Sequence, residues 1–340
     1  MMTEPKKRHS NVALFVPHAG CPHQCSFCNQ RHIAGTQSMP TVQDVITACE
    51  NALKTRRTCA EESEIAFFGG SFTAIAQETM VDLLKAAYPY VENGSFGGIR
   101  LSTRPDAINE DILLLLRDYG VTTIELGAQS MDDRVLLQNG RGHTAKDVQA
   151  AAKLIKVHGF SLGLQMMTGL PGDSDDGAIN TARQLADLQP DCVRIYPTLV
   201  IENTPLARWY RRGEYQPQTV EEAVELCSRL LSFFEEERHI PVIRLGLHNE
   251  TDMQGHCLAG PFHPAFRERC ESLLWLQRIR AVLRERQRGM VRIGVSPSQL
   301  SKAIGQKREN VDKLRAEGYV AVIKADPDLN EKDLRVEVIE

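Results

Sequence analysis

Three closely spaced cysteines carry the clearest chemical signal in this 340-residue sequence. Cys21, Cys25 and Cys28 follow the pattern C-x3-C-x2-C, and Phe27 directly precedes the last cysteine. Thiolates are the usual ligands of iron–sulfur clusters, and a cluster of four irons has four ligand positions. Three cysteines would therefore hold a 4Fe–4S cluster and leave one iron open to a small molecule.

A structural zinc site is the alternative for the same segment. Three cysteines and a histidine bind zinc well, and His18, His23 and His32 are close enough in the sequence to supply the fourth ligand. The spacing favours the cluster but leaves zinc open. The remaining cysteines show no comparable spacing, and buried free cysteines are common in protein cores.

A second group of possible ligands lies in one segment further along the chain. His248, His256, Cys257 and His263 could together bind a metal. Residues of this kind in a long loop more often cap the mouth of a barrel, and we favour that interpretation.

The elements that would position these residues alternate along the chain as short apolar runs and helical stretches. Several runs look apolar on both faces, as strands of a parallel sheet under helices must be. Six βα units in series predict an α/β fold with a parallel (β/α)6-type partial TIM barrel, whose chemistry lies on loops after the carboxyl ends of the strands. The expected strands are Val12–Val16, Glu64–Phe68, Gly98–Ser102, Thr122–Leu126, Phe160–Met166 and Cys192–Tyr196. The expected helices are Val42–Thr55, Ile75–Tyr88, Asn109–Tyr119, Ala145–His158, Gly177–Leu188 and Val220–Glu237.

The last third of the chain departs from the alternation of strands and helices. Pro241–Leu247 reads as a seventh strand or an extension of the sheet, His248–Phe266 as a long loop and Glu268–Gln287 as a helix. We therefore expect a barrel core over residues 1–247, a connecting loop and helix over 248–288, and a small α+β domain over 289–340.

Further motifs extend the cysteine pattern into a family resemblance. C-x3-C-x2-C with an aromatic residue before the last Cys is the signature of radical S-adenosylmethionine (SAM) enzymes. Together the motifs look like the branch that includes the catalytic subunit of Elongator, a tRNA-modifying enzyme, with the coproporphyrinogen dehydrogenases more distant. The resemblance covers about residues 11–247, and its other motifs are FFGGSFT at 67–73, STRPD at 102–106, ELGAQS at 125–130, NGRGHT at 139–144, GLPG at 169–172 and RIYPT at 194–198.

Two departures limit what the resemblance implies. The cysteine spacing is the short one common among radical SAM enzymes, whereas Elongator's subunit has a longer one. No acetyltransferase domain follows the core in this sequence, so the expectation does not extend to acetyl transfer.

The resemblance implies two cofactors and a reductant. A 4Fe–4S cluster on the three cysteines would bind the amino and carboxylate groups of SAM at its open iron. An electron from the reduced cluster would cleave the sulfonium bond to give methionine and a 5′-deoxyadenosyl radical, which abstracts hydrogen from the substrate. A small-molecule electron donor or a flavodoxin- or ferredoxin-type reductant would supply that electron.

The same resemblance implies residues that hold SAM. Glycines let the backbone approach a ligand closely, although a tight βα turn explains Gly69 and Gly70 as well. An arginine suits a carboxylate through two parallel hydrogen bonds. The implied contacts are Gly69, Gly70 and Ser71 to the methionine ammonium, Ser102 and Arg104 to the carboxylate and ribose, Gln129 to the ribose, and Gly169, Gly172 and the backbone beside Phe27 to adenine.

Polar residues in or at the ends of strands could contact the substrate. Glu125, Arg194 and Tyr196 are the candidates for this catalytic role. A buried ion pair between Glu125 and Arg194 is the alternative, and the sequence does not decide between them.

The carboxyl-terminal segment looks like a KH domain, in which a G-x-x-G loop between two helices clamps a single-stranded nucleic-acid backbone. The second glycine is Arg308 here, which puts close approach in question while its charge would attract phosphate. Residues 286–324 hold nine Lys or Arg against three Asp or Glu, a local basic footprint. A small packing domain with a solvated basic face is the alternative. The expected RNA contacts are Lys302, Gly305, Lys307, Arg308 and Lys313.

Composition and net charge limit the partners and the location that we expect for this protein. The net charge of −4 argues against polyanion binding by the chain as a whole. No apolar run approaches the ~20 residues that a membrane-spanning helix needs, so we expect no membrane partner and a cytoplasmic location. We interpret the sequence as a radical SAM enzyme that acts on RNA, with tRNA as the best guess. A radical SAM enzyme for a small metabolite or protein and a zinc-bound, catalytically silent RNA-binding protein remain the alternatives.

The cysteine assignment predicts the metal content. Protein reconstituted without oxygen should carry about four irons and four sulfides. Replacing Cys21, Cys25 and Cys28 by Ala should abolish both the brown colour and SAM cleavage. Iron, sulfide and zinc analysis checks this, and stoichiometric zinc without iron after anaerobic preparation would contradict it.

Overall fold

The computed structural model of the protein describes residues 10–16, 21, 25–29, 38–55, 58–247 and 255–339. His18, His23, His32 and His248, which the sequence proposes as possible metal ligands, lie outside these ranges. Within them no helix is long and apolar enough to cross a membrane.

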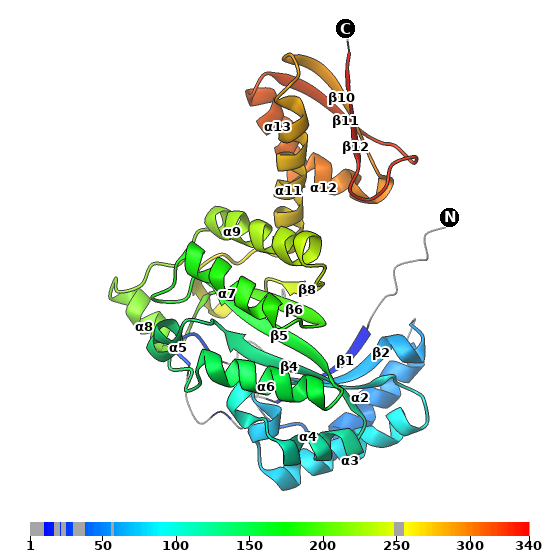
Figure 1. The fold of residues 1–340 in the computed structure, drawn as a ribbon, viewed down its shortest axis with the longest axis vertical. Coiled ribbons are helices and arrows are strands. Elements are labelled where there is room, and N and C mark those ends of the chain that lie inside the picture. Colours follow the sequence, from blue (N-terminus) through cyan, green and yellow to red (C-terminus); the bar gives the residue numbers. More distant parts are fainter. Residues whose placement is uncertain are drawn as a thin grey trace.

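Seven parallel strands form one curved sheet in the order β1-β2-β3-β4-β5-β6-β8 (Figure 1). The sheet confirms the predicted α/β partial barrel, and the seventh strand settles the interpretation of residues 241–247. β1 and β8 do not pair among the described residues, so the barrel stays open there. The strands are β1 (Ser10–Val16), β2 (Ser63–Gly69), β3 (Gly98–Thr103), β4 (Val121–Gln129), β5 (Ser161–Thr168), β6 (Cys192–Pro197) and β8 (Val242–Leu245).

Helices follow the strands and cover the outer face of the sheet (Figure 1). Side-chain caps fix several of their starts: the Thr144 and Thr219 hydroxyls each complete a capping box with the acidic residue three positions later. The main helices are α2 (Val42–Thr55), α3 (Gln77–Glu92), α4 (Glu110–Asp118), α6 (Ala145–Val157), α7 (Asp175–Asp187) and α9 (Val220–Ser232), and α9 continues into a π-helical turn at Phe233–Glu237.

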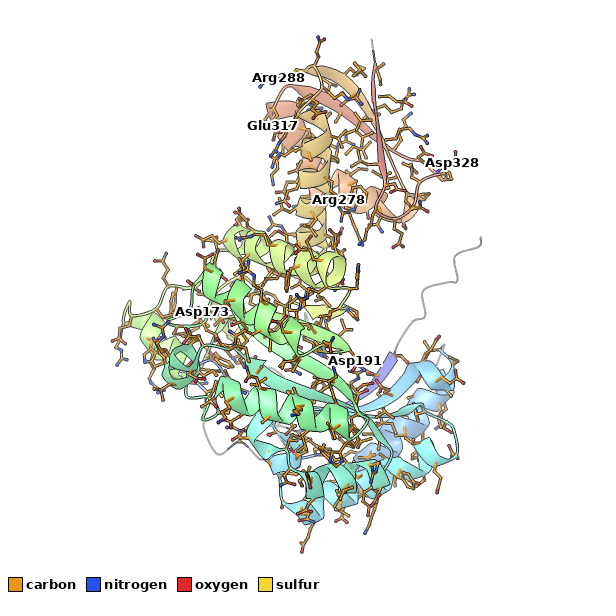
Figure 2. All side chains as sticks on the ribbon, viewed as in Figure 1. Asp173, Asp191, Arg278, Arg288, Glu317 and Asp328 are labelled. Carbon is orange, nitrogen blue, oxygen red and sulfur yellow. The ribbon has the colours of Figure 1, made fainter. Side chains whose placement is uncertain are left out.

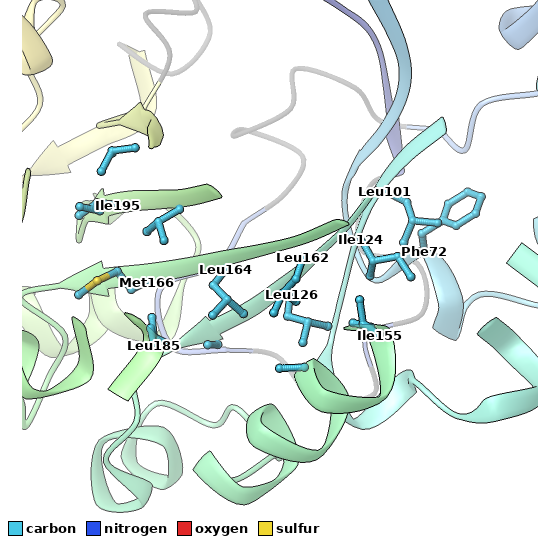
Figure 3. Close-up of a cluster of buried hydrophobic side chains, with 14 of the residues drawn as sticks. Phe72, Leu101, Ile124, Leu126, Ile155, Leu162, Leu164, Met166, Leu185 and Ile195 are labelled. Atoms are coloured by element: carbon cyan, nitrogen blue, oxygen red, sulfur yellow. The ribbon is translucent and has the colours of Figure 1, made fainter. Parts of the chain in front are cut away.

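The core lies between the sheet and these helices. Every second residue of a strand points to the outer face, and Leu126 of β4 and Leu164 of β5 are fully buried against α6 and α7 (Figure 3). Phe67 and Phe72 stack with their ring centroids 4.6 Å apart. This layer is apolar, as a sheet covered by helices requires.

The inner face of the sheet corrects the expectation that the strands are apolar on both faces. Alternate positions of β2 to β6 carry charged or polar side chains that point into the barrel. They lie beside a cavity, so their polar atoms bond one another instead of packing against a second layer of helices. They are Glu64, Arg100, Glu125, Gln165 and Arg194.

Several short elements were not expected from the sequence. α5 (Asp133–Gln138) and α8 (Pro205–Arg211) are short helices. β7 (Val200–Ile201) pairs antiparallel with β9 (Cys257–Ala259), so part of the segment interpreted as a long loop is a strand. Two- and three-residue strands carry too little periodicity to be read from sequence.

The carboxyl-terminal part has the predicted order of strand, helix, Gly loop, helix and strand. α11 leads into it, and its last turns pack Trp275, Leu276 and Ile279 into a second apolar core. Arg278 of α11 (Figure 2) bonds the Glu236 carboxylate at the end of α9. The elements are α11 (Phe266–Leu283), β10 (Gly289–Val295), α12 (Leu300–Ile304), α13 (Glu309–Ala316), β11 (Tyr319–Ala325) and β12 (Leu334–Val338). β10 pairs parallel with β11 and antiparallel with β12.

Candidate functional site

A cavity of about 440 Å³ occupies the inside of the barrel, a size typical of small-molecule sites. Seven of the residues that the sequence proposes line it: Phe27, Cys28, Gly69, Ser102, Gln129, Arg194 and Tyr196. Asn11, Ala13, Phe15, Phe68, Gln165, Met167, Pro197, Leu199, Ile201, Arg244 and Leu247 complete the lining. Eight residues proposed for the cluster, SAM or the substrate do not line it: Cys21, Cys25, Gly70, Ser71, Arg104, Glu125, Gly169 and Gly172.

Glu125 is fully buried beneath the cavity floor. Its carboxylate accepts hydrogen bonds from Arg100 Nη1 at 2.9 Å, from Arg194 Nη2 at 2.8 Å and from Gln165 Nε2 at 2.9 Å. Gly163 on the next strand leaves the room for it, because a Cβ there would lie 2.7 Å from Glu125 Cγ. The ion pair with Arg194, which the sequence left as an alternative, is present, and a catalytic role of Glu125 stays a prediction.

Arg100 and Arg194 supply the positive charges that pair with the buried carboxylates. Arg100 also donates to Glu64 Oε2 at 2.7 Å, and the two glutamates raise the pKa of the Arg100 guanidinium against the effect of its burial. Arg194 lies over the Phe68 ring, 4.7 Å from its centroid, and its Nη1 is 3.5 Å from Tyr196 Oη. Two glutamates and two arginines thus balance one another in the barrel interior, which spares it an unpaired buried charge.

The cysteine segment is held by a motif whose role sequence reasoning missed. Arg141 donates from Nη1 to Cys25 Sγ at 3.1 Å and from Nη2 to the Gly127 carbonyl at 2.6 Å. Asn139 accepts from Ser26 Oγ at 2.6 Å. Both belong to the NGRGHT stretch, which carried the family resemblance without an assigned function. An asparagine and an arginine flanked by two glycines were the signal available in this stretch.

Arg104 is placed differently from expectation. It donates twice to Asp106, from Nε at 2.8 Å and from Nη2 at 2.9 Å, and once from Nη2 to the Arg141 carbonyl at 2.8 Å. Ser71 Oγ bonds Thr103 at 2.9 Å and accepts from the Arg104 amide. Both residues tie the loops after β2 and β3 together, and their contacts to SAM stay predictions.

The glycines after β5 are favoured by their backbone conformation, and the ends of two glutamine side chains lie close to them. Gly169 and Gly172 have φ values of 69° and 80°, which favour glycine. A Cβ at Gly169 would meet Gln218 at 2.7 Å, and one at Gly172 would meet Gln138 at 2.1 Å. The turn therefore explains these two positions without an adenine contact.

Three buried polar atoms near the strand ends have no hydrogen-bond partner among the described residues: Gln129 Oε1, on a residue that lines the cavity, and Arg104 Nη1 and Arg141 Nε, on residues that do not. Gln129 and Arg141 are close, since a Cβ at Gly127 would touch both. Buried polar groups are almost always paired, so these donors and acceptor fit a polar ligand such as SAM. Burial, reinforced by the neighbouring Cys25, raises the pKa of the Cys21 thiol, and the positive charges of Arg104 and Arg141 offset only part of that rise.

The three thiols are not gathered as a finished metal site. Among the described residues no three His, Cys, Asp or Glu side chains are close enough together to hold a metal ion. Cys25 is buried while Cys21 and Cys28 are partly exposed. The ligand assignment therefore depends on the cysteine pattern and on the comparisons below.

The Gly loop of the carboxyl-terminal part keeps a left-handed backbone despite its arginine. Gly305, Lys307 and Arg308 have φ values of 81°, 50° and 68°, and left-handed residues other than glycine cost of order 1–3 kcal/mol. Asn310 holds the loop, donating to the Ser272 carbonyl at 2.9 Å and to the Ala303 carbonyl at 3.1 Å.

Only part of the predicted basic set is available to a ligand. Lys302 pairs with Glu271 at 2.9 Å and Lys313 with Glu309 at 2.6 Å. Lys307 and Arg308 are exposed, and neither has an ion pair within the part of the chain that the structure describes. These two cations at the loop tip are therefore the ones that a phosphate could reach.

His256 and Cys257 do not form a metal site with His263 in the described residues. His256 Nδ1 lies 3.1 Å from Glu202 Oε2, and Asn29, next to Cys28, donates to the Glu202 carbonyl at 3.1 Å. The contacts place this segment beside the cysteine loop at the barrel mouth, in agreement with a capping role.

The chain matches known proteins in both halves of the barrel. A model of the radical SAM superfamily matches residues 15–185, and a model of the radical SAM C-terminal domain matches residues 190–275. The tRNA uridine(34) acetyltransferase of Methanocaldococcus jannaschii is 37% identical over 131 residues, which cover 38% of this chain and 24% of that protein. Human Elongator complex protein 3 is 34% identical over 138 residues, covering 40% and 25%.

A third relative and a solved structure extend the match. The tRNA uridine(34) acetyltransferase of Dehalococcoides mccartyi is 26% identical over 239 residues, covering 61% of this chain and 52% of that protein. The chain thus spans between a quarter and a half of the length of these relatives. The structure of Methanocaldococcus infernus Elp3 lacking residues 1–46 covers 84% of this chain and 66% of its own, with a TM-score of 0.61 at 23% identity. That likeness shows the shared fold.

The hydrogen bond from Arg141 to Cys25 predicts an effect on the reduction potential of the cluster. A reduced cluster carries one more negative charge, and hydrogen bonds to its sulfurs help set its potential. Arg141→Ala should therefore shift the reduction potential to a more negative value, while Arg134→Ala, whose side chain is 92% exposed, should not. A redox titration followed by electron paramagnetic resonance (EPR) checks this. Equal potentials and equal iron content in both variants and the parent would contradict it.

His143 predicts a pH dependence of stability. Burial, reinforced by the Arg141 charge, lowers the pKa of His143 to about 4 from 6.5. Between these values the unfolded chain binds a proton that the folded chain does not, so the free energy of unfolding should fall as the pH drops from 6.5 to 4, by about 3 kcal/mol. His143→Gln should flatten this part of the profile in denaturant titrations, and His158→Gln should not. Profiles of equal slope in the parent and His143→Gln would show that His143 does not contribute.

Proposed function

Because this chain belongs to the radical SAM superfamily, we propose that Cys21, Cys25 and Cys28 hold its 4Fe–4S cluster, that SAM binds in the barrel cavity, and that the enzyme modifies RNA, with tRNA as the substrate class. A flavodoxin- or ferredoxin-type protein or a small molecule serves as its reductant, and it acts in the cytoplasm. The proposal keeps the division into a core over 1–247, a connection over 248–288 and a KH-like domain over 289–340.

One observation carries the proposed chemistry. Phe27 and Cys28 of the cysteine loop line the same cavity as Gln129, whose Oε1 has no partner among the described residues, and Arg141 connects Cys25 of that loop to the Gly127 carbonyl. When bound, the reduced cluster supplies the electron that cleaves SAM to methionine and a 5′-deoxyadenosyl radical.

The chain's own residues orient the ligand and exclude water. Gln165 Nε2 donates to Ser102 Oγ at 3.2 Å, and both residues line the cavity, where they can contact ribose hydroxyls. Gln129 extends from the end of β4 with its Oε1 free to accept. Phe27, Met167 and Leu199 form an apolar wall that keeps bulk water from a reactive radical.

Two features support RNA as the substrate. The Gly loop presents Lys307 and Arg308 on a turned backbone, as a clamp for single-stranded phosphates requires. Relatives in three organisms bear names of tRNA-modifying enzymes or of Elongator. The cavity alone would suit a small metabolite equally well. The carboxyl-terminal KH-like domain therefore decides between the two substrate classes.

Nucleoside analysis tests the proposed function. Total tRNA from cells with the parent protein, without it, and with a Cys28→Ala variant is digested and compared by mass spectrometry. We expect one modified nucleoside that is present only with the parent. Identical nucleoside profiles in all three, with SAM cleavage intact in vitro, would favour a small-metabolite substrate.

The KH-like domain predicts that RNA affinity falls when the charges of its Gly loop are reversed. Lys307→Asp combined with Arg308→Asp should weaken the binding of all RNA sequences alike, because phosphate contacts position a ligand without reading bases. The salt dependence should become shallower, by about 0.7 per lost contact for single strands. Fluorescence anisotropy at several salt concentrations measures both.

A matched control has the same charge change on the other face of the domain. Arg292 and Lys324 are exposed on the side of the β10–β11 sheet that faces away from α12 and α13. Arg292→Asp with Lys324→Asp should bind RNA nearly as the parent does. If the loop variant also binds as tightly as the parent, the tail is a packing domain.

A further inference from the structure

The barrel cavity extends along β1, away from the residues proposed to hold SAM. Asn11, Ala13 and Phe15 of β1 all line it, and as alternate residues of one strand they share its inner face. Val16, the last residue of β1, pairs with Gly69 at the end of β2, where the proposed SAM contacts begin. Phe15 is therefore next to the cofactor end of the cavity, and Ala13 and Asn11 lie further from it.

Two phenylalanine rings mark the boundary between these two parts of the cavity. Phe15 pairs with Phe68 in the register of β1 and β2, and their ring centroids are 6.5 Å apart with the planes at 48°. Both side chains are half-buried and line the cavity. The Arg194 guanidinium lies over the Phe68 ring and holds it from one side. The pair thus presents aromatic surface to a ligand, a surface that favours stacking with another ring.

Ala13 leaves room beside the rings. Phe15 and Asn11 are four residues apart, about 13 Å along the strand, and only Ala13 lies between them on the inner face. Ala13 and Asn11 are both exposed, so no described side chain fills the space beside them. A flat ring can lie there against Phe15, and the Asn11 amide can donate to and accept from its polar groups.

We propose that this part of the cavity is the subsite for the target nucleobase, which stacks on Phe15 over Ala13. This rests on the proposed RNA substrate and adds the residues that select its reacting part. Enzymes that act on a base take it out of the stack into a pocket, where aromatic side chains stack on it and hydrogen bonds recognise its edge. Phe15 supplies the platform, and the small side chain of Ala13 keeps the space open.

A comparison of ligands with and without a base tests the subsite. The four ribonucleoside 5′-monophosphates and ribose 5-phosphate are titrated calorimetrically into the full chain, loaded with its oxidised cluster and saturated with SAM. Ribose 5-phosphate has the same sugar and phosphate but no ring. At least one monophosphate should therefore bind more tightly than ribose 5-phosphate, and that gain measures the contribution of the base.

Three variants locate the gain. Phe15→Ala should reduce it by about tenfold, the usual effect of removing one stacking ring, and Phe15→Tyr should retain it because the ring remains. Ala13→Leu should reduce it as well, by filling the space without disturbing a core. Tyr210→Ala is the control: it removes an aromatic side chain that is 37% exposed on α8 and does not line the cavity, and it should keep the gain. Iron content confirms that each variant is folded.

The outcomes separate the subsite from the proposed function. If no monophosphate binds the parent more tightly than ribose 5-phosphate, or if Phe15→Ala and Ala13→Leu both keep the gain, the subsite is wrong while RNA modification can still hold. If Ala13→Leu weakens SAM binding, this part of the cavity belongs to the SAM site and the proposal is also wrong. If the gain depends on Phe15 but total tRNA is the same with and without the protein, the RNA substrate fails and the ring subsite stands.

Discussion

The site depends on the Arg141 guanidinium, which connects the irregular segment around Cys25 to the sheet. The described residues around Cys25 form no helix or strand of their own, so their backbone gains no stability from regular hydrogen bonding. Arg141 connects the Cys25 sulfur to the carbonyl of Gly127 near the end of β4. Asn139 holds Ser26 with two hydrogen bonds: its side-chain oxygen accepts from the Ser26 hydroxyl, and its carbonyl accepts from the Ser26 amide. These hydrogen bonds thereby fix the cysteine loop in place at the end of the parallel sheet.

A second constraint is charge balance inside the barrel. A sheet that is polar on its inner face can be buried only if each charge has a partner, because an unpaired buried charge costs several kcal/mol. Glu125 meets this condition through Arg100 and Arg194, and Glu64 through Arg100 and two threonines. The network leaves Arg194 and Gln165 oriented toward the cavity. It therefore shapes the binding surface and stabilises the fold with the same contacts.

The sequence was sufficient for the architecture because periodicity and motif order depend on local residues. The α2 helix and the seven strands of the large sheet were predicted close to their actual bounds. The inner face was misjudged, since an apolar run with one Glu or Arg does not show which residues will pair across strands. The resemblance assigns Arg104 to SAM; in the structure Arg104 bonds Asp106 two residues away, and its contact with SAM stays a prediction. The contact of Arg141 with Cys25 joins residues 116 positions apart, a separation that no local pattern encodes.

The most direct test of the account is EPR of the reduced protein before and after SAM is added. Only a cluster with an iron that lacks a protein ligand changes its signal when SAM binds, and three cysteines leave one such iron. The account predicts a 4Fe–4S signal that shifts on SAM addition, followed by the release of 5′-deoxyadenosine and methionine. A protein that contains zinc and shows no iron signal, or a cluster signal that SAM leaves unchanged, would contradict it.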